Sequence, residues 1–142
     1  MIDIDAGVKW AEGIAADDSH GYSQPNRMSG VDYDCSALVG AAVRKMGFTS
    51  YPHTWYPSTR EMGAYLEGIG WKWHEGTNGL QRGDILWKSG HTALAVSGTK
   101  QVEACISENG TIHGAYGDQT GQEIRISNVS IYAWKGYWFY SE

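Results

Sequence analysis

Long hydrophobic runs are absent from this sequence of 142 residues. A membrane-spanning helix needs about 20 consecutive apolar residues, and no segment approaches that length. Segment 1–18 carries acidic side chains where a secretory signal needs a basic region followed by an apolar run. We therefore expect no membrane partner and no export signal in this chain.

Positive charge is also scarce. The chain has 11 Lys and Arg against 16 Asp and Glu, a net charge of −5, and its basic residues are scattered. Proteins that bind nucleic acids gather basic side chains on one surface to neutralise phosphates. The composition therefore argues against a nucleic-acid partner.

Cysteines are few as well. Cys35 and Cys105 are too few for a disulfide scaffold, and they do not form a CxxC pair. Each cysteine must therefore be judged by its neighbours.

Apolar and aromatic side chains are plentiful. Of the residues, 42% are hydrophobic and 13% aromatic, with seven Trp and nine Tyr but only two Phe. A chain of this length can bury one core, whereas two domains would be cramped. We expect one domain over residues 1–142, with amphipathic rings in its core and in a groove that stacks on a ligand.

The order of the periodic segments predicts an α+β fold. Apolar residues at helical spacing predict helices over 5–16, 34–47 and 58–68, with caps at Asp5, Asp34 and Ser58, the last paired with Glu61. Turn-forming residues predict a long loop over 17–32. Six later segments alternate with period two and predict strands over 71–74, 84–88, 92–96, 101–106, 123–127 and 137–140. Helices followed by strands favour a mostly antiparallel sheet.

Three residues suggest nucleophilic catalysis. Cys35 lies at the start of the second expected helix, where unpaired backbone N–H groups and the helix dipole favour a thiolate. His91 opens an expected strand, so that its imidazole can pair with that thiolate. Glu103, on the next strand, can orient the imidazole.

Each of these residues also has a plain structural interpretation. A cysteine among small residues is most often only packing, a histidine at a strand start is more often structural, and Glu103 can be a solvated strand residue. The spacing alone leaves the two interpretations open.

Three segments carry a resemblance to a known family. Segments 33–39 (YDCSALV), 82–87 (RGDILW) and 90–96 (GHTALAV) are similar to the DCS helix start, the RGD strand and the GH strand of NlpC-type papain-like cysteine peptidases. The chain resembles in particular the peptidoglycan hydrolases of bacteriophage lysins. The likeness runs in the family's order from about residue 5 to 140. It implies an NlpC-type papain-like fold with N-terminal helices packed on the sheet.

The resemblance also implies roles for particular residues. The family's nucleophile falls on Cys35, its general base on His91 and its third polar position on Glu103. The tyrosine upstream of the nucleophile, which helps to hold the oxyanion, falls on Tyr22. No cofactor is needed for this chemistry. Trp55 and Tyr56, in a loop-like aromatic segment, are our candidates for the substrate groove.

Several alternatives remain open. The bond cleaved lies within the peptidoglycan stem peptide, which we favour, or between the muramic acid lactyl group and L-Ala, as in an N-acetylmuramoyl-L-alanine amidase. An acyltransferase uses the same three residues, and a wall-binding module without activity would keep only the aromatic groove. A zinc site formed by His91, Cys105 and His113 matches none of the usual ligand spacings.

The expected setting follows from the same resemblance. A phage lysin is made in the host cytoplasm and released to the cell wall, whereas a catalytic domain of a longer protein would be secreted with it. We expect a monomer.

Overall fold

The computed structural model describes residues 2–16, 21–22, 32–49, 56–104, 124–130 and 133–141; for 21–22 and 32 it describes the backbone only. Three helices precede the main sheet: α1 (Ile4–Ala16), α2 (Cys35–Lys45) and α3 (Met62–Gly68). The strands are β1 (Gly21–Tyr22), β2 (Asp32–Tyr33), β3 (Trp71–Glu75), β4 (Ile85–Lys88), β5 (His91–Ala95), β6 (Lys100–Ala104), β7 (Ile124–Asn128) and β8 (Gly136–Tyr140). None of these helices is long and apolar enough to cross a membrane.

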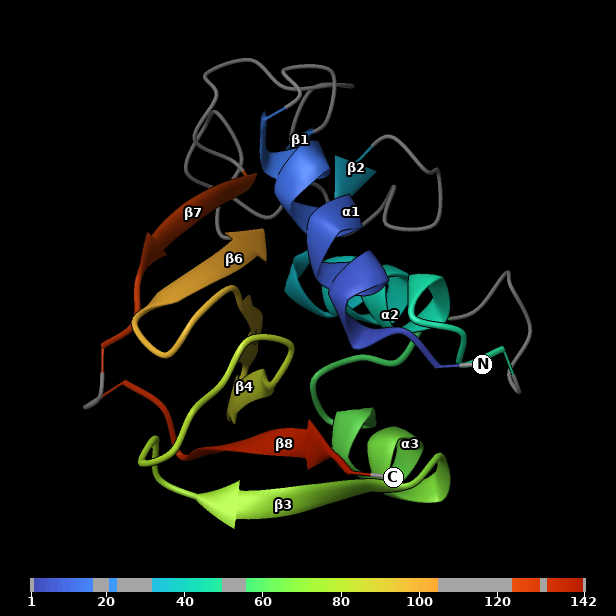
Figure 1. Cartoon of the computed structure of the whole chain (residues 1–142), viewed down its shortest axis with the longest axis vertical. Helices are drawn as coiled ribbons and strands as arrows, with labels where there is room; N and C mark the ends of the chain where they lie inside the picture. Colours follow the sequence, from blue (N-terminus) through green and yellow to red (C-terminus); the bar gives the residue numbers. More distant parts are fainter. Residues whose placement is uncertain are drawn as a thin grey trace.

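Six strands form one antiparallel sheet in the order β3-β8-β4-β5-β6-β7 (Figure 1). The last strand, β8, is inserted between β3 and β4. The predicted α+β class, with helices before a mostly antiparallel sheet, is confirmed. One pair of strands was not predicted: β1 and β2 pair in parallel, and β1 lies inside the expected loop 17–32.

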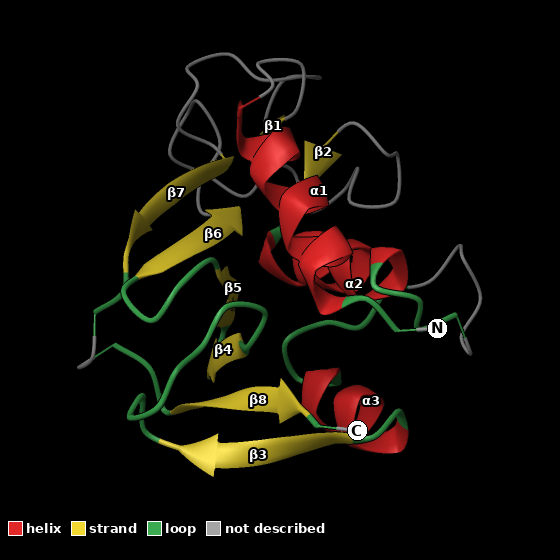
Figure 2. Cartoon of the chain, in the orientation of Figure 1, coloured by secondary structure: helices red, strands yellow, loops and turns green. Residues whose placement is uncertain are grey.

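The helices cover one face of the sheet. Helix α3 packs on β3 at one end, α1 packs on β6 and β7 at the other, and α2 lies between them on β5 and β6 (Figure 2). The main core fills the space between these layers and includes Leu38, Leu66, Leu94 and Val102, each fully buried. A smaller cluster lies on the other face, around Leu86, Ala93, Trp134 and Tyr137. The sheet is therefore buried on both sides near its centre.

Helix α2 is the central element of the helical layer. The carboxylate of Asp34 caps it by accepting a hydrogen bond from the backbone N–H of Ala37 at 2.8 Å, as predicted. The first nine residues of the helix, 35–43, are all buried, because small side chains let it sit closely between α1 and the sheet. This packing holds the first turn of α2 rigidly against β5.

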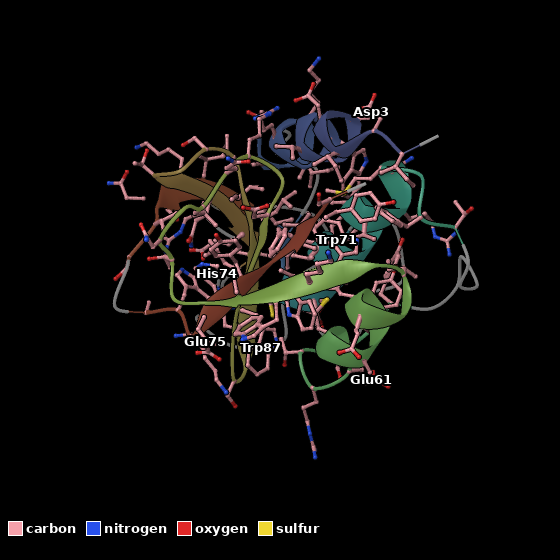
Figure 3. All side chains as sticks on the ribbon, turned by 60° about the horizontal axis from the view of Figure 1, so that its bottom comes forward. Asp3, Glu61, Trp71, His74, Glu75 and Trp87 are labelled. Carbon is pink, nitrogen blue, oxygen red and sulfur yellow. The ribbon has the colours of Figure 1, made fainter. Side chains whose placement is uncertain are left out.

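The other two helices begin differently from the prediction. Asp3, not Asp5, accepts the hydrogen bond from the N–H of Ala6 that caps α1, at 3.1 Å (Figure 3). Helix α3 begins at Met62 instead of Ser58. The Glu61 side chain nevertheless accepts a hydrogen bond from the N–H of Ser58, at 3.0 Å, so half of the expected capping box forms one turn before the helix.

Residues 82–84 (RGD) form a structural corner between α1 and the sheet. Arg82 donates to Asp5 and to Glu12 of α1, both at 2.7 Å, so Asp5 serves an ion pair. Gly83 has a φ of +94°, and a Cβ atom there would lie 2.1 Å from the Ile4 side chain. The glycine is therefore needed both for its backbone conformation and for the close approach of α1.

We predict that Gly83→Ala lowers the free energy of unfolding by about 1–3 kcal/mol, because alanine is strained at this φ and its methyl group would displace Ile4. Thermal denaturation should show a melting temperature lower by several degrees. Gly13→Ala is the matched control, because a Cβ atom at this position in α1 would meet nothing outside its own helix within 4 Å. The free energy of unfolding of Gly13→Ala should rise by about 0.4–1 kcal/mol. Equal stability of the two variants would contradict the role of the corner.

Candidate active site

Cys35 is the first residue of α2. The helix supplies no acceptor for its backbone N–H, since the first four N–H groups of a helix have no partner within it. Its side chain is largely buried but lines an open cleft, and only 8% of the residue is exposed. The sulfur therefore lies at the positive end of a helix dipole, with a donor N–H beside it.

His91 and Glu103 lie side by side on neighbouring strands. His91 is the first residue of β5 and Glu103 is the fourth of β6, and the His91 Nε2 atom lies 3.1 Å from Glu103 Oε2. Cys35 lines the same cleft as His91 and is close enough to help to raise the pKa of His91. The structure thus brings together Cys35, His91 and Glu103, the three residues singled out in the sequence.

The carboxylate of Glu103 is surrounded by donors. Gln101 Nε2 donates to Oε2 at 2.6 Å, while Arg125 Nη2 at 3.3 Å and Ser127 Oγ at 3.4 Å donate to Oε1. Burial opposes the charged form, but the hydrogen bond and charge of His91 and the charge of Arg125 outweigh it and lower the pKa of Glu103. Glu103 is therefore an ionised acceptor.

This acceptor decides how His91 is oriented. Because ionised Glu103 can only accept, the Nε2 atom of His91 donates to it, which leaves Nδ1 for Cys35. Burial disfavours the imidazolium, but hydrogen bonds to Cys35 and Glu103 and the charges of both groups raise the pKa of His91 from 6.5 to about 9. The arrangement stabilises a protonated His91 at neutral pH.

Trp134 completes a ring of contacts around the imidazole. Its indole lies nearly parallel to the His91 ring, with centroids 5.4 Å apart, and its Nε1 donates to Gln101 Oε1 at 3.1 Å. The Nζ atom of Lys88 lies 5.9 Å from the centroid of the same indole. Gln101 thus bonds both Trp134 and Glu103, the two residues that contact the His91 ring. This link fixes Trp134 and Glu103 relative to each other.

Sequence reasoning missed Trp134, Gln101 and Arg125. Arg125 is directly opposite Glu103 in the β6–β7 pairing, and Gln101 lies two residues from Glu103 on the same face of β6. Because side chains alternate between the two faces of a strand, the sequence could have placed Gln101 on the same face of β6 as Glu103. Trp134 follows β7 in a loop, and no local pattern marks it.

The cleft beside Cys35 has a volume of about 790 Å³. Its described walls come from the start of α2, the segment before α3, the β4–β5 turn, β6, β7 and the segment around Trp134. They carry Lys88 and Arg125 as well as hydroxyl and amide groups. This is space for an extended polar substrate at the sulfur.

Of the other three predicted site residues, one is described in full, one by its backbone alone, and one lies outside the described residues. The backbone of Tyr22 pairs with that of Tyr33, two residues before Cys35, but its side chain lies outside the described residues, as does all of Trp55. Tyr56 packs against Gly40 of α2 and is not among the described residues that line the cleft. The roles of these residues stay predictions.

The comparison with known families gives a clear result. A family model described as bacteriophage peptidoglycan hydrolase matches residues 3–141, almost the whole chain. The chain belongs to this family. No curated protein matches the sequence. Membership establishes a hydrolase of peptidoglycan and confirms the resemblance to phage peptidoglycan hydrolases. The assignment to the NlpC-type papain-like peptidases stays a prediction.

The zinc alternative involves residues that are only partly placed. Within the described ranges, no group of three or more His, Cys, Asp or Glu side chains is arranged to hold a metal ion. Cys105 and His113 lie outside those ranges.

We predict that Glu103→Gln lowers the pKa of His91 from about 9 toward 6.5, because the variant removes a negative charge at 3.1 Å. An NMR titration of the His91 ring protons in the variant and in the unaltered protein measures this pKa. The pKa of His91 is raised by folding, so protonated His91 stabilises the fold fully below about pH 6.5, and this contribution disappears as the pH rises through about 9. The variant should lose that pH dependence of the unfolding free energy.

Glu75→Gln is the control for this experiment, since Glu75 is an exposed carboxylate on β3 that bonds Trp73 instead of His91. A His91 pKa near 6.5 in the unaltered protein would contradict the proposed ion pair, as would an unchanged pKa in Glu103→Gln.

Proposed function

We propose that this family member is a cysteine-dependent endopeptidase that cleaves an amide bond within the peptidoglycan stem peptide. The observation that supports this most strongly is the placement of Cys35, His91 and Glu103 at one cleft, with His91 between the other two. We also assign the chain to the NlpC-type papain-like group. The three motifs and the position of the cysteine at a helix start ahead of an antiparallel sheet support that assignment.

The first half of the reaction forms a thioester. The Cys35 thiolate attacks the carbonyl carbon of the scissile amide, and the carbonyl oxygen becomes an oxyanion that accepts a hydrogen bond from the backbone N–H of Cys35. Tyr22, which the resemblance names, is our candidate for the second donor. Protonated His91 then gives its Nδ1 proton to the nitrogen of the leaving amine as the C–N bond breaks.

The second half releases the acid product. Neutral His91 takes a proton from a water molecule, whose oxygen attacks the thioester carbon. Collapse of the second oxyanion breaks the C–S bond and restores the thiolate beside protonated His91. Glu103 keeps its charge throughout and holds the imidazole with Nδ1 toward the sulfur.

A cation on the cleft wall suits a bound stem peptide. Stem peptides carry carboxylates, and Lys88, at the end of β4, places an ammonium group on the cleft wall. We therefore place the stem peptide along this wall.

We predict that Cys35→Ala abolishes clearing of a purified cell-wall suspension, because the variant lacks the thiol that lies at the cleft beside His91. Iodoacetamide should have the same effect on the unaltered protein, whereas EDTA should have none. Mass spectrometry of the fragments should show a new free amino group within the stem. A new amino group on L-Ala would instead identify an amidase, and products carrying an added amine would identify an acyltransferase.

Cys105→Ala is the matched control, which should keep its activity and its sensitivity to iodoacetamide. Clearing by Cys35→Ala would refute the thiol mechanism, and inhibition by EDTA would favour a metal enzyme.

We predict that Trp134→Leu lowers kcat about 2- to 30-fold, because a ring stacked on an imidazolium contributes about 0.5–2 kcal/mol. KM should change little, and the pKa of His91 should fall in the same variant. Trp134→Phe keeps a stacked ring but loses the bond to Gln101, so its loss should be smaller. A lower kcat with an unchanged His91 pKa would show that Trp134 acts only through packing.

A further inference from the structure

A second hollow, of about 410 Å³, lies between α3 and strands β3, β4 and β8. Its floor consists of three indole rings, and its rim carries two cations and one carboxylate. Trp87 lies on the side of β3 where α3 is found (Figure 3). The lining residues are Trp73, Trp87 and Trp138, with Arg60, Gly63, Glu67 and Lys135.

The indole N–H groups of two of these rings already have partners. Trp73 Nε1 donates to Glu75 Oε1 at 2.8 Å, and Trp87 Nε1 donates to the carbonyl oxygen of Thr59 at 2.9 Å. These rings can therefore offer a ligand only their carbon surfaces. Hydrogen bonds to a ligand must come from the charged rim.

The rings are held in place by close packing. Trp73 contacts Trp87 edge to face at 6.1 Å between centroids and lies 5.4 Å from Trp138. A Cβ atom at Gly136 would lie 2.6 Å from the Trp73 ring, and one at Gly63 would lie 3.3 Å from Trp138. The glycines thus let the indoles rest against backbone, which gives a rigid aromatic surface.

This hollow and the cleft at Cys35 are lined by neighbouring residues. At three places, consecutive residues line one and the other: Thr59 and Arg60, Lys88 and Trp87, and Trp134 and Lys135, where the first of each pair faces the cleft. Consecutive Cα atoms are about 3.8 Å apart. The two openings are therefore close enough for different parts of one polymer to occupy both.

We propose that the aromatic hollow binds a sugar ring of the peptidoglycan glycan strand while the stem peptide occupies the cleft. A pyranose presents a flat face of C–H groups, which suits an indole surface whose N–H is occupied. Its hydroxyl and acetamido groups lie at the ring edge, where Arg60, Glu67 and Lys135 supply donors and acceptors. A neutral ring also fits a rim of mixed charge, whereas a chain of carboxylates would meet Glu67.

The proposal rests on peptidoglycan as the substrate, and it is independent of the thiol chemistry. The test therefore uses the full chain with Cys35→Ala and a peptide-free probe, the tetramer of β-1,4-linked N-acetylglucosamine. Titration with this probe is followed by the indole ¹H–¹⁵N signals in NMR, assigned by Trp→Phe variants. We expect the signals of Trp73, Trp87 and Trp138 to shift together. No shift, or a shift of the Trp134 signal alone, would overturn the proposal.

Two variants identify the surface that binds the probe. Trp73→Leu should weaken binding about 2- to 10-fold by removing one ring face. The double variant Arg60→Ala with Lys135→Ala should weaken it as well, and because both residues are exposed it decides the matter if Trp73→Leu does not fold. Lys72→Ala, an exposed lysine on β3 outside the hollow, is the matched control. Equal affinity in the double variant and the control would overturn the proposal.

Binding and catalysis fail separately in these experiments. Loss of clearing in Cys35→Ala tests the thiol mechanism, while binding of the tetramer to that same inactive variant tests the sugar site. A protein that binds the tetramer at the indoles but clears cell walls without Cys35 would keep the sugar site and refute only the endopeptidase mechanism.

Discussion

The buried negative charge of Glu103 is the constraint on which the site depends. An isolated carboxylate with only 6% exposure would be strongly destabilising, by several kcal/mol. Here donors from β5, β6 and β7 surround it, so the charge is kept and in turn keeps His91 protonated and oriented. The same contacts tie three neighbouring strands together, so the chemistry of the site and the geometry of the sheet support each other.

The alternation of side chains along β6 lets one strand serve two purposes. Val102 and Ala104 enter the main core, which α2 shares. Gln101 and Glu103 point to the opposite face and build the polar network. Because α2 packs on β5 and β6, the helix that carries Cys35 is positioned by the same strands that carry its partners. The distance between sulfur and imidazole is thus set by core packing.

The sequence located most of the elements and, through the family resemblance, the three residues that the structure brings to one cleft, but not the contacts around them. Periodicity located three helices and six strands, and Asp34 was a readable cap because its signal is local. Arg125 and Trp134 depend on strand register and on a loop distant in sequence, which no local pattern encodes. Residues 82–84 were recognised only as a family motif. The structure shows why a glycine is needed at position 83: α1 approaches its backbone closely there.

The insertion of β8 between β3 and β4 has a consequence for the order in which the sheet folds. Until β8 pairs with both neighbours, β3 and β4 are not joined in one sheet. Trp134, just before β8, is then not held against His91. Pairing of strands so distant along the chain is slow. The sheet is therefore completed late in folding, and the indole of Trp134 stacks on His91 only when β8 is in place, after α2, β5 and β6 have brought Cys35, His91 and Glu103 together.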